Sequence, residues 1–317
     1  MGEGERHVPV LAERVVDLAV PSPGREWMAV DCTVGAGGHA ERLLDAMGPE
    51  GRLLGIDRDE QALRLAGERL ARFGERVRLV KGRFSELGEI VEEHGWGRTD
   101  AVIYDFGVSS MQLDEAGRGF SYQHDAPLDM RMDPSQPTSA RDLLNTASER
   151  DLTRIIREYG EERWASRIAK FIVQARSRRA IETTGDLVEI IRAAIPVSAR
   201  RVGPHPARRT FQALRIAVNG ELEEIDASLP QAVAELASGG RLVALSYHSL
   251  EDRRVKRFLR QEATGEAPRL RLLTRKPERP SEQEAAANPR ASAAKLRAAE
   301  RLASAPVNDP DDGGRAA

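Results

Sequence analysis

Short apolar runs alternate with amphipathic segments through the first third of the chain. The runs at 28–31, 52–56, 77–80 and 101–104 have the length and composition of buried strands. Between the second and third runs, Glu60 to Phe73 repeats apolar residues at helical spacing. Strands that alternate with helices predict an α/β fold with a parallel, doubly wound sheet.

The alternation stops after Asp105. The segment 109–137 is rich in Gly, Asp, Ser and Pro, which indicates a loop. The next clear strand comes only at 242–246, and 269–274 is a candidate edge strand. Between these points, helical patterns cover 143–159, 162–175, 186–195 and 211–237. The segment 196–209 is a basic loop that contains prolines.

The distance between the fourth and fifth strands predicts an inserted domain. A single crossover takes about 30 residues, whereas here the gap leaves room for a helical insertion of about 100 residues. We therefore expect a sheet domain in two parts, 1–113 and 211–302, with a helical insertion at 114–210. The last segment, 303–317, is expected to be a disordered tail.

Composition places the chain among soluble proteins. Hydrophobic residues make up 40% and charged residues 31% of the 317 positions. There is no apolar stretch long enough for a transmembrane helix, and the N-terminus lacks a signal-peptide layout. The single cysteine, Cys32, excludes an internal disulfide and makes a cysteine-based metal site unexpected. A cytoplasmic protein with no membrane partner and no metal is expected.

Charge is distributed unevenly. The formal net charge is −2, but residues 141–215 hold 15 Arg and 1 Lys against 9 Asp and Glu, a local net of 16 − 9 = +7. A basic segment on an acidic body fits a phosphate-binding lobe on a catalytic domain. Amphipathic helices with solvated Arg faces would give the same count, so both interpretations stay open.

A glycine-rich turn joins the first strand to the first helix. Residues 34–39 bring backbone amides close to any ligand placed there, and Asp57 ends the next strand, where a carboxylate can bind ribose hydroxyls. The turn also satisfies the dinucleotide pattern Gly-x-Gly-x-x-Ala. Asp31 precedes the glycines; it suits the cationic methionine part of S-adenosylmethionine and would repel a pyrophosphate.

The fourth strand runs into Asp105-Phe106-Gly107-Val108. Enzymes that methylate the amino nitrogens of bases carry an acidic or amide residue followed by a tight apolar turn at this place. A buried capping aspartate is the alternative interpretation of Asp105.

These residues, with others along nearly the whole chain, resemble the RsmH family, also called MraW, of ribosomal RNA cytosine-N4 methyltransferases. The matching motifs are His7 to Leu11, Asp31 to Ala40, Gly55 to Asp59, Asp105 to Ser110, Gln112 to Asp114, Arg118 to Ser121, Asp129 to Asp133, Arg209 to Arg215, Ser246 to Arg253, Asn288 to Arg290 and Lys295 to Arg297. The sequence departs from the family pattern at three places. Tyr104 and Phe106 flank Asp105 where the family more often has smaller or aliphatic residues, Tyr247 stands where the family usually has Phe, and Ser292-Ala293 interrupt the tail motif.

The resemblance implies a class I S-adenosylmethionine-dependent methyltransferase fold with a helical insertion, acting on a cytidine of 16S ribosomal RNA in an assembled or assembling small subunit. The cofactor contacts that it implies are Gly37, Gly38, His39, Asp57, Phe84, Asp105 and Gln112. Taken alone, Phe84 could equally be a core aromatic and His39 a polar helix cap, while Gln112 has no independent argument.

The chemistry expected of such an enzyme makes Asp105 and the backbone carbonyls after it the catalytic candidates. The cytosine N4 lone pair is conjugated into the ring, so an acceptor must hold the N–H groups while positive charge develops on nitrogen. His248 follows the fifth strand at the same sheet edge and either contacts the base or orders the loop. Methylation at cytosine C5 generally needs a cysteine nucleophile, but Cys32 lies on the cofactor side and is expected to pack.

RNA contacts are expected in the loop and the insertion. Arg118 and Arg131 could meet phosphates, and Phe120, Tyr122 and His124 could stack on an unpaired base, with loop packing as the alternative. Further phosphate contacts are expected in the basic loop, at Arg200, Arg201 and Arg208.

Two other functions remain open at this point. The glycine pattern also fits an NAD-dependent oxidoreductase. A non-catalytic ribosome assembly factor with a vestigial cofactor pocket would share the basic insertion. The sequence does not indicate the oligomeric state.

Overall fold

The computed structural model describes residues 9–20, 25–200 and 205–303. Arg201 lies outside these ranges, and so does the expected disordered tail, except for its first residue. Within the described residues, no helix is long and apolar enough to cross a membrane.

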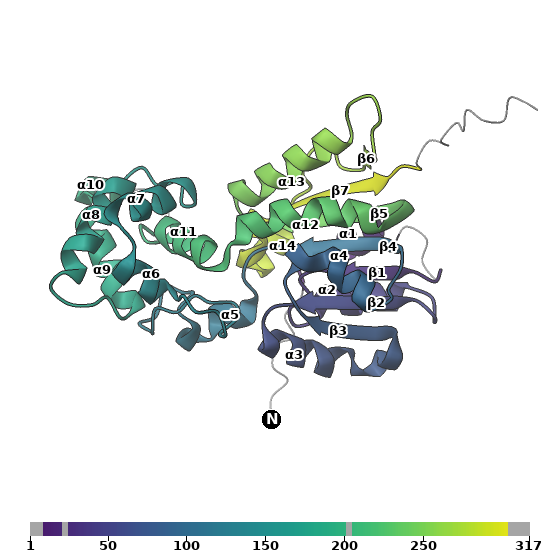
Figure 1. Cartoon of the computed structure of the whole chain (residues 1–317), viewed down its shortest axis with the longest axis horizontal. Coiled ribbons are helices and arrows are strands. Elements are labelled where there is room, and N and C mark those ends of the chain that lie inside the picture. The colour runs from purple at the N-terminus through teal and green to yellow at the C-terminus, as the bar shows by residue number, and fades with distance from the viewer. Residues whose placement is uncertain (1–8, 21–24, 201–204, 304–317) are drawn as a thin grey trace, which may run out of the picture.

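A seven-stranded sheet forms the body of the molecule, in the order β3-β2-β1-β4-β5-β7-β6 (Figure 1). The strands β1 to β5 run parallel, as predicted, and β7 pairs antiparallel with β5 and β6. The bounds are Met28–Asp31 (β1), Arg52–Asp57 (β2), Val77–Lys81 (β3), Thr99–Asp105 (β4), Leu236–Ser246 (β5), Leu270–Leu272 (β6) and Lys295–Arg301 (β7).

Alternating side chains of the strands fill two cores, one on each face of the sheet. Val30 and Val102 face the core made with α4 (Leu87–Glu93), α12 (Glu221–Glu235) and α13 (Ser249–Glu262). Ala29 and Ile103 face the other core, made with α1 (Ala12–Ala19), α2 (Gly38–Ala46) and α3 (Glu60–Leu70). Burial on both faces explains why the central strands read as continuous apolar runs.

The insertion forms a separate helical lobe with its own core. Figure 1 shows it beside the edge of the sheet where the parallel strands end. Leu152, Ile168, Ile191 and Phe211 are among its buried residues. Its helices are α6 (Ala140–Thr146), α7 (Glu149–Glu158), α8 (Ala165–Arg176), α9 (Thr184–Ala194), α10 (Val197–Arg200) and α11 (Arg208–Asn219).

The predicted helix 143–159 is wrong, because the chain breaks between α6 and α7. Ala147 is extended, and the Ser148 side chain accepts from the Asp151 amide to start α7. The predicted helix 211–237 is also divided, since Gly220 adopts φ 61°, a left-handed conformation that ends α11. Its last residues, 236–237, belong to β5.

Short elements also occupy segments that were expected to be loops. α5 (Ser110–Asp114) lies within 109–137, and α10 and the start of α11 lie within 196–209. The candidate edge strand at 269–274 is present as β6. The remaining elements are 3₁₀ helices at Ala71–Arg76, Phe84–Glu86, Ala116–Arg118 and Pro289–Ala293, and the helix α14 (Glu282–Ala287).

Candidate cofactor and acceptor site

The glycine turn after β1 packs tightly on the neighbouring elements. Gly35 and Gly37 have positive φ angles of 52° and 79°, which favour glycine. A Cβ on Gly37 would lie 3.3 Å from Ala66 Cα, and one on Gly38 would lie 3.3 Å from Pro9 Cβ. The backbone can therefore approach a ligand, and its amides lead into the N-terminus of α2.

Asp57, at the end of β2, is tied to this turn. Its carboxylate accepts from the Gly35 amide at 2.9 Å through Oδ2 and from the Asp59 amide at 2.9 Å through Oδ1. Burial raises the pKa of Asp57 to about 6, although these hydrogen bonds oppose the shift. The carboxylate is thus held in one orientation beside the glycines, as the ribose contact requires.

Asp31 adds a second desolvated carboxylate at the end of β1. It accepts from the Thr33 amide at 3.1 Å, and burial, reinforced by the charges of Asp105 and Asp57, raises its pKa to about 8. Three acidic strand ends lie together on β2, β1 and β4, and their mutual repulsion helps to keep Asp31 protonated in the absence of a cation. A cationic sulfonium cofactor can displace that proton, whereas a pyrophosphate would bring further negative charge to the site.

Asp105, at the end of β4, is held from several sides. Its amide donates to Thr33 Oγ1 at 2.6 Å, and its Oδ1 accepts from the Tyr247 hydroxyl at 2.7 Å. His39 Nδ1 lies 3.5 Å from Oδ2, while His39 Nε2 lies 2.9 Å from the carbonyl oxygen of Val10. The Asp105 side chain remains 28% exposed, so an acceptor amine can reach a carboxylate that is already oriented.

Aromatic rings line the same edge. Phe84 lies edge-on to Tyr104, with ring centroids 5.9 Å apart, and Tyr104 stacks on Phe106 at 5.1 Å. Phe84 is only partly buried, so it packs on the core and still presents a surface beside the end of β3. Its contact with adenine stays a prediction.

Gln112 has an internal role that sequence reasoning did not anticipate. Its Oε1 accepts from the Ser109 amide at 3.1 Å, and its Nε2 donates to Asp59 Oδ2 at 2.9 Å. The buried amide thereby fixes the start of α5 against the loop that carries Asp57. A direct cofactor contact of Gln112 stays a prediction.

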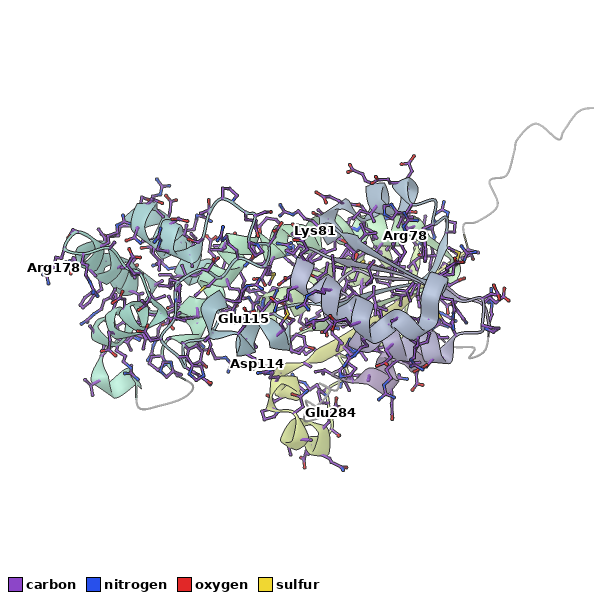
Figure 2. All side chains as sticks on the ribbon, turned by 90° about the horizontal axis from the view of Figure 1, so that it is seen from below. Arg78, Lys81, Asp114, Glu115, Arg178 and Glu284 are labelled. Atoms are coloured by element: carbon purple, nitrogen blue, oxygen red, sulfur yellow. The ribbon has the colours of Figure 1, made fainter. Side chains whose placement is uncertain are left out.

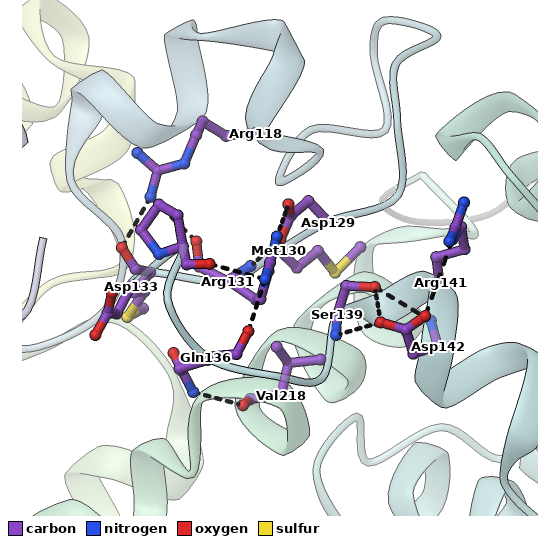
Figure 3. Close-up of polar contacts among 12 residues, drawn as sticks. Arg118, Asp129, Met130, Arg131, Asp133, Gln136, Ser139, Arg141, Asp142 and Val218 are labelled. Carbon is purple, nitrogen blue, oxygen red and sulfur yellow. Dashed lines mark hydrogen bonds and ion pairs between the residues drawn. The ribbon is translucent and has the colours of Figure 1, made fainter.

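Arg118 and Arg131 are engaged by the protein itself (Figure 3). Arg118 donates to Asp59 Oδ2 at 2.9 Å and to the Met132 carbonyl at 2.9 Å. Arg131 binds both oxygens of Asp129, at 2.7 and 2.8 Å, and the Gln136 carbonyl at 2.6 Å. Phosphates would have to compete with these bonds, so the two arginines stabilise their own loop, and Arg118 also ties it to Asp59.

The aromatic candidates are divided. Tyr122 stacks on His205, with centroids 4.7 Å apart and ring planes 6° apart, and Phe120 is buried. His124 is exposed. Arg208 is also exposed, whereas the side chain of Arg200 lies outside the described part of the structure. Loop packing therefore accounts for Phe120 and Tyr122.

His248 begins α13. Its Nδ1 accepts from the Glu251 amide at 3.3 Å, and Nε2 lies 3.0 Å from Glu251 Oε1. Burial would raise the pKa of Glu251, but the charges of His248 and Arg215 outweigh it, and the pKa is lowered. This geometry supports the loop-ordering interpretation of His248.

One cluster among the described residues has the composition of a metal site. Ligand-type atoms of Glu221, His248 and Glu251 lie within 4.8 Å of one another. However, Arg215 binds both oxygens of Glu221, at 2.8 and 2.7 Å, and supplies positive charge there. The cluster therefore works as a buried ion-pair network between α11, α12 and α13.

Sequence reasoning missed two residues of this site. Tyr247 reaches Asp105 across 142 positions, and Asp59 joins Gln112 and Arg118 to the cofactor loop. The only available signal for Tyr247 was its departure from the usual Phe. Asp59 has the residue type and position of a helix N-cap, and this local role gives no indication that it also binds Gln112 and Arg118.

Comparisons with known proteins point in one direction. The model of a family described as the MraW methylase family matches residues 4–302. The Ribosomal RNA small subunit methyltransferase H of Symbiobacterium thermophilum is 52% identical over 309 residues, covering 93% of this chain and 96% of that protein. Proteins of the same name from Heliobacterium modesticaldum and Thermobifida fusca are 50% and 53% identical over 310 residues, covering 93% of this chain each and 98% and 93% of those proteins.

Proposed function

Because the chain belongs to the MraW methylase family, we propose that it transfers the methyl group of S-adenosylmethionine to N4 of a cytidine in small-subunit (16S) ribosomal RNA. The choice of N4 as the methyl acceptor rests on the Asp105 carboxylate, which Tyr247 orients at a strand end next to the glycine turn. The names of the relatives supply the substrate class.

The residues at the strand ends fit the cofactor. The amides of the turn at 35–38 approach its methionine part, Asp57 accepts from the ribose hydroxyls, and Asp31 places negative charge near its cationic groups. S-adenosylmethionine, when bound, supplies an electrophilic methyl group. Everything else in the reaction is positioning by this chain.

Asp105 acts on the acceptor. Its carboxylate accepts an N–H of the cytosine amine and turns the nitrogen lone pair toward the methyl group. As the N–C bond forms, positive charge develops on N4, and a carboxylate fixed in place stabilises it without reorganising. The extra proton on N4 then passes along the same hydrogen bond to the Asp105 carboxylate.

Cys32 does not serve as a nucleophile. Burial raises the pKa of its thiol far above the usual value, so the thiolate needed for attack on C6 is disfavoured. The residue is about 1% exposed and packs in the sheet core. Amine attack is therefore favoured over C5 methylation.

The insertion is proposed to hold the RNA backbone. On α8 the exposed positions are Ser166, Arg167, Lys170 and Gln174, with no acid among them. Arg178 lies at the far end of the lobe (Figure 2). Phosphate contacts at Arg118, Arg131, Arg200, Arg201 and Arg208 stay predictions. We place the enzyme in the cytoplasm, on an assembled or assembling small subunit.

The rival functions lose their support here. The match to a family of methylases over residues 4–302 contradicts both an NAD-dependent oxidoreductase and a purely non-catalytic assembly factor.

The test is methyl transfer to purified small ribosomal subunits, followed by nuclease digestion and mass spectrometry. We expect N4-methylcytidine, a loss of about 100-fold or more in kcat for Asp105→Ala, and nearly full activity for Cys32→Ser. Calorimetry should show that both variants still bind the cofactor. A 5-methylcytidine product, or an Asp105→Ala enzyme with normal kcat, would refute the proposed mechanism.

A further inference from the structure

The helix α13 carries a basic face that no part of the proposed chemistry uses. Its exposed positions are Arg253, Lys256, Arg257, Arg260 and Gln261. The four basic residues follow the spacing i, i+3, i+4, i+7, so they form one stripe along the helix. At about 1.5 Å of rise per residue, the stripe is about 10 Å long.

The acids of α13 do not neutralise this stripe. Glu251 is buried against His248, Asp252 binds Arg297 and Lys295, and Glu262 binds Arg269. All three carboxylates are therefore paired away from the exposed face. The exposed face of α13 is therefore basic, on a protein whose net charge is −2.

The positive charge is concentrated in the later part of the stripe. Arg253 pairs with Glu161 of the insertion at 2.8 Å, and the adjacent Arg254 pairs with Asp226 of α12 at 3.0 Å. Among the residues that the structure describes, no ion pair is found for Lys256, Arg257 or Arg260. By contrast, the exposed face of α7 mixes three acids with three arginines, as a solvated surface helix does.

The position of the stripe connects it to the active site. α13 begins directly after β5, at the edge of the sheet where Asp105 lies and which the insertion faces (Figure 1). Through Arg253 and Glu161 the stripe starts at the junction with the insertion and then runs along the sheet domain. A strand whose base enters the site can therefore lie along α13 on its way out.

We propose that Lys256, Arg257 and Arg260 bind the phosphate backbone of the RNA substrate, so that the sheet domain holds RNA as well as the insertion. The inference rests on the proposed function, since it takes RNA as the partner. Long cationic side chains at one-turn spacing match successive phosphates, and they carry no base preference.

The experiment compares two triple variants by fluorescence anisotropy with a labelled single-stranded RNA of about 20 nucleotides. The first is Lys256→Gln, Arg257→Gln, Arg260→Gln. The matched control is Arg42→Gln, Arg52→Gln, Arg78→Gln, which removes the same charge from exposed positions away from the acceptor edge; Arg78 is labelled on β3 in Figure 2. Melting temperature and cofactor affinity are measured for both.

We expect the α13 variant to lose about tenfold in RNA affinity near 0.1 M salt and to flatten the log–log salt slope by about 2, at about 0.7 per lost contact. The control should keep both the wild-type affinity and slope. Unchanged RNA binding by the α13 variant, or equal losses in both variants, overturns the proposal.

Two further measurements distinguish a failure of the proposed α13 contact from a failure of the proposed function. Vesicles containing phosphatidylserine test an anionic lipid surface, and binding to vesicles but not to RNA through these residues overturns the proposal. Methyl transfer to small subunits by the wild-type enzyme tests the proposed function separately. A wild type that methylates and binds RNA, with an unaffected α13 variant, refutes only the α13 contact.

Discussion

At the scale of single residues, the site is governed by carboxylates removed from water. Asp31 and Asp57 lie at adjacent strand ends, and burial raises the pKa of both, to about 8 and about 6. Keeping such groups ionised costs free energy unless a cation or hydrogen-bond donors are close. The ionisation of these two carboxyl groups therefore depends on whether the cationic cofactor is bound, so the pH dependence of cofactor binding reports on it.

We predict that S-adenosylmethionine affinity rises with pH through the pKa of Asp31. Below about pH 8 this carboxyl is mostly protonated, and a cationic ligand must displace the proton. Affinity should then rise by up to about tenfold per pH unit until the pKa is passed. Calorimetry at neutral pH in two buffers of different ionisation enthalpy measures the released proton.

The control for this prediction is Asp31→Asn, which has no proton to release. The ligand's own amino group titrates equally in both proteins, so the difference isolates Asp31. If the wild type and the variant release the same number of protons, Asp31 does not face the cationic part of the cofactor.

Tyr247 is predicted to orient Asp105. In Tyr247→Phe the hydroxyl that donates to Asp105 Oδ1 is lost, a charge-assisted bond worth about 1.5–3 kcal/mol. The carboxylate becomes less acidic and less fixed. Because the bond also stabilises the ground state, only about 0.7–1.4 kcal/mol of it should appear in the barrier, so kcat should fall about three- to tenfold and the acidic limb of the pH–rate profile should move to higher pH. Cofactor affinity should stay unchanged.

Tyr159→Phe is the matched control for Tyr247, because its hydroxyl donates to the exposed Glu223 in another region. This variant should keep the wild-type kcat and pH profile. An identical pH profile for Tyr247→Phe would leave that tyrosine with a packing role alone.

At the scale of helices, capping side chains decide where elements begin. Ser109, Ser148 and Thr183 each accept from the amide three residues onward, and each starts a helix. His248 does the same for α13 and also contacts the buried Glu251. The cap therefore links helix formation to the loop that carries Tyr247.

His248→Ala should lower the free energy of unfolding by about 1–3 kcal/mol, through the lost cap and the weakened partner of Glu251. His248→Asn keeps an acceptor at the cap and should recover part of this loss. Urea denaturation gives both values, and methyl transfer is measured in parallel.

The activity of the His248 variants distinguishes ordering from catalysis. If His248 orders the loop, activity follows stability, and the Asn variant is the more active of the two. A stable His248→Asn enzyme without activity would instead give His248 a direct role with the base.

At the scale of the whole molecule, the active site is built where the insertion meets the sheet. Asn219, the last residue of α11, donates to the Met130 carbonyl and accepts from the Met132 amide, both at 2.8 Å. Arg58, beside Asp57, donates to the Asn219 carbonyl at 2.9 Å. A few buried polar groups thus fix the loop around Met130 and Met132 to the end of α11 and to the residue that follows β2.

Asn219→Ala should leave the Met130 and Met132 backbone groups unsatisfied and cost about 2–4 kcal/mol of stability. Since the loop over the active site loosens, kcat/KM for the ribosomal subunit should fall more than cofactor affinity does. Denaturation, calorimetry and methyl transfer together measure this separation.

Asn145→Ala is the control for the junction. Asn145 bonds the Arg141 carbonyl and both backbone groups of Ile181, wholly within the insertion. It should destabilise the protein without a specific loss in kcat/KM. Equal effects of the two substitutions on methyl transfer would show that the junction has no particular role in catalysis.

Local sequence patterns determined a large part of this protein. The apolar runs predicted five parallel strands because strands buried on both faces need apolar side chains at successive positions. The glycine turn and Asp57 located the cofactor loop, since its geometry demands those residues within a short stretch of chain. The position of Asp105 at a strand end followed from the same pattern.

Only the tertiary structure decided the rest. The strand β7 carries few β-branched or aromatic residues, and its pairing with β5 sets Leu296 opposite Leu245, so a distant partner makes it a strand. The pairs Tyr247–Asp105 and Arg118–Asp59 join residues 142 and 59 positions apart. Local periodicity indicates which face of an element is buried. The partner of a polar group depends instead on how whole elements pack against one another. Once such a group is buried, it must have a hydrogen-bond partner, because an unpaired buried polar group costs free energy.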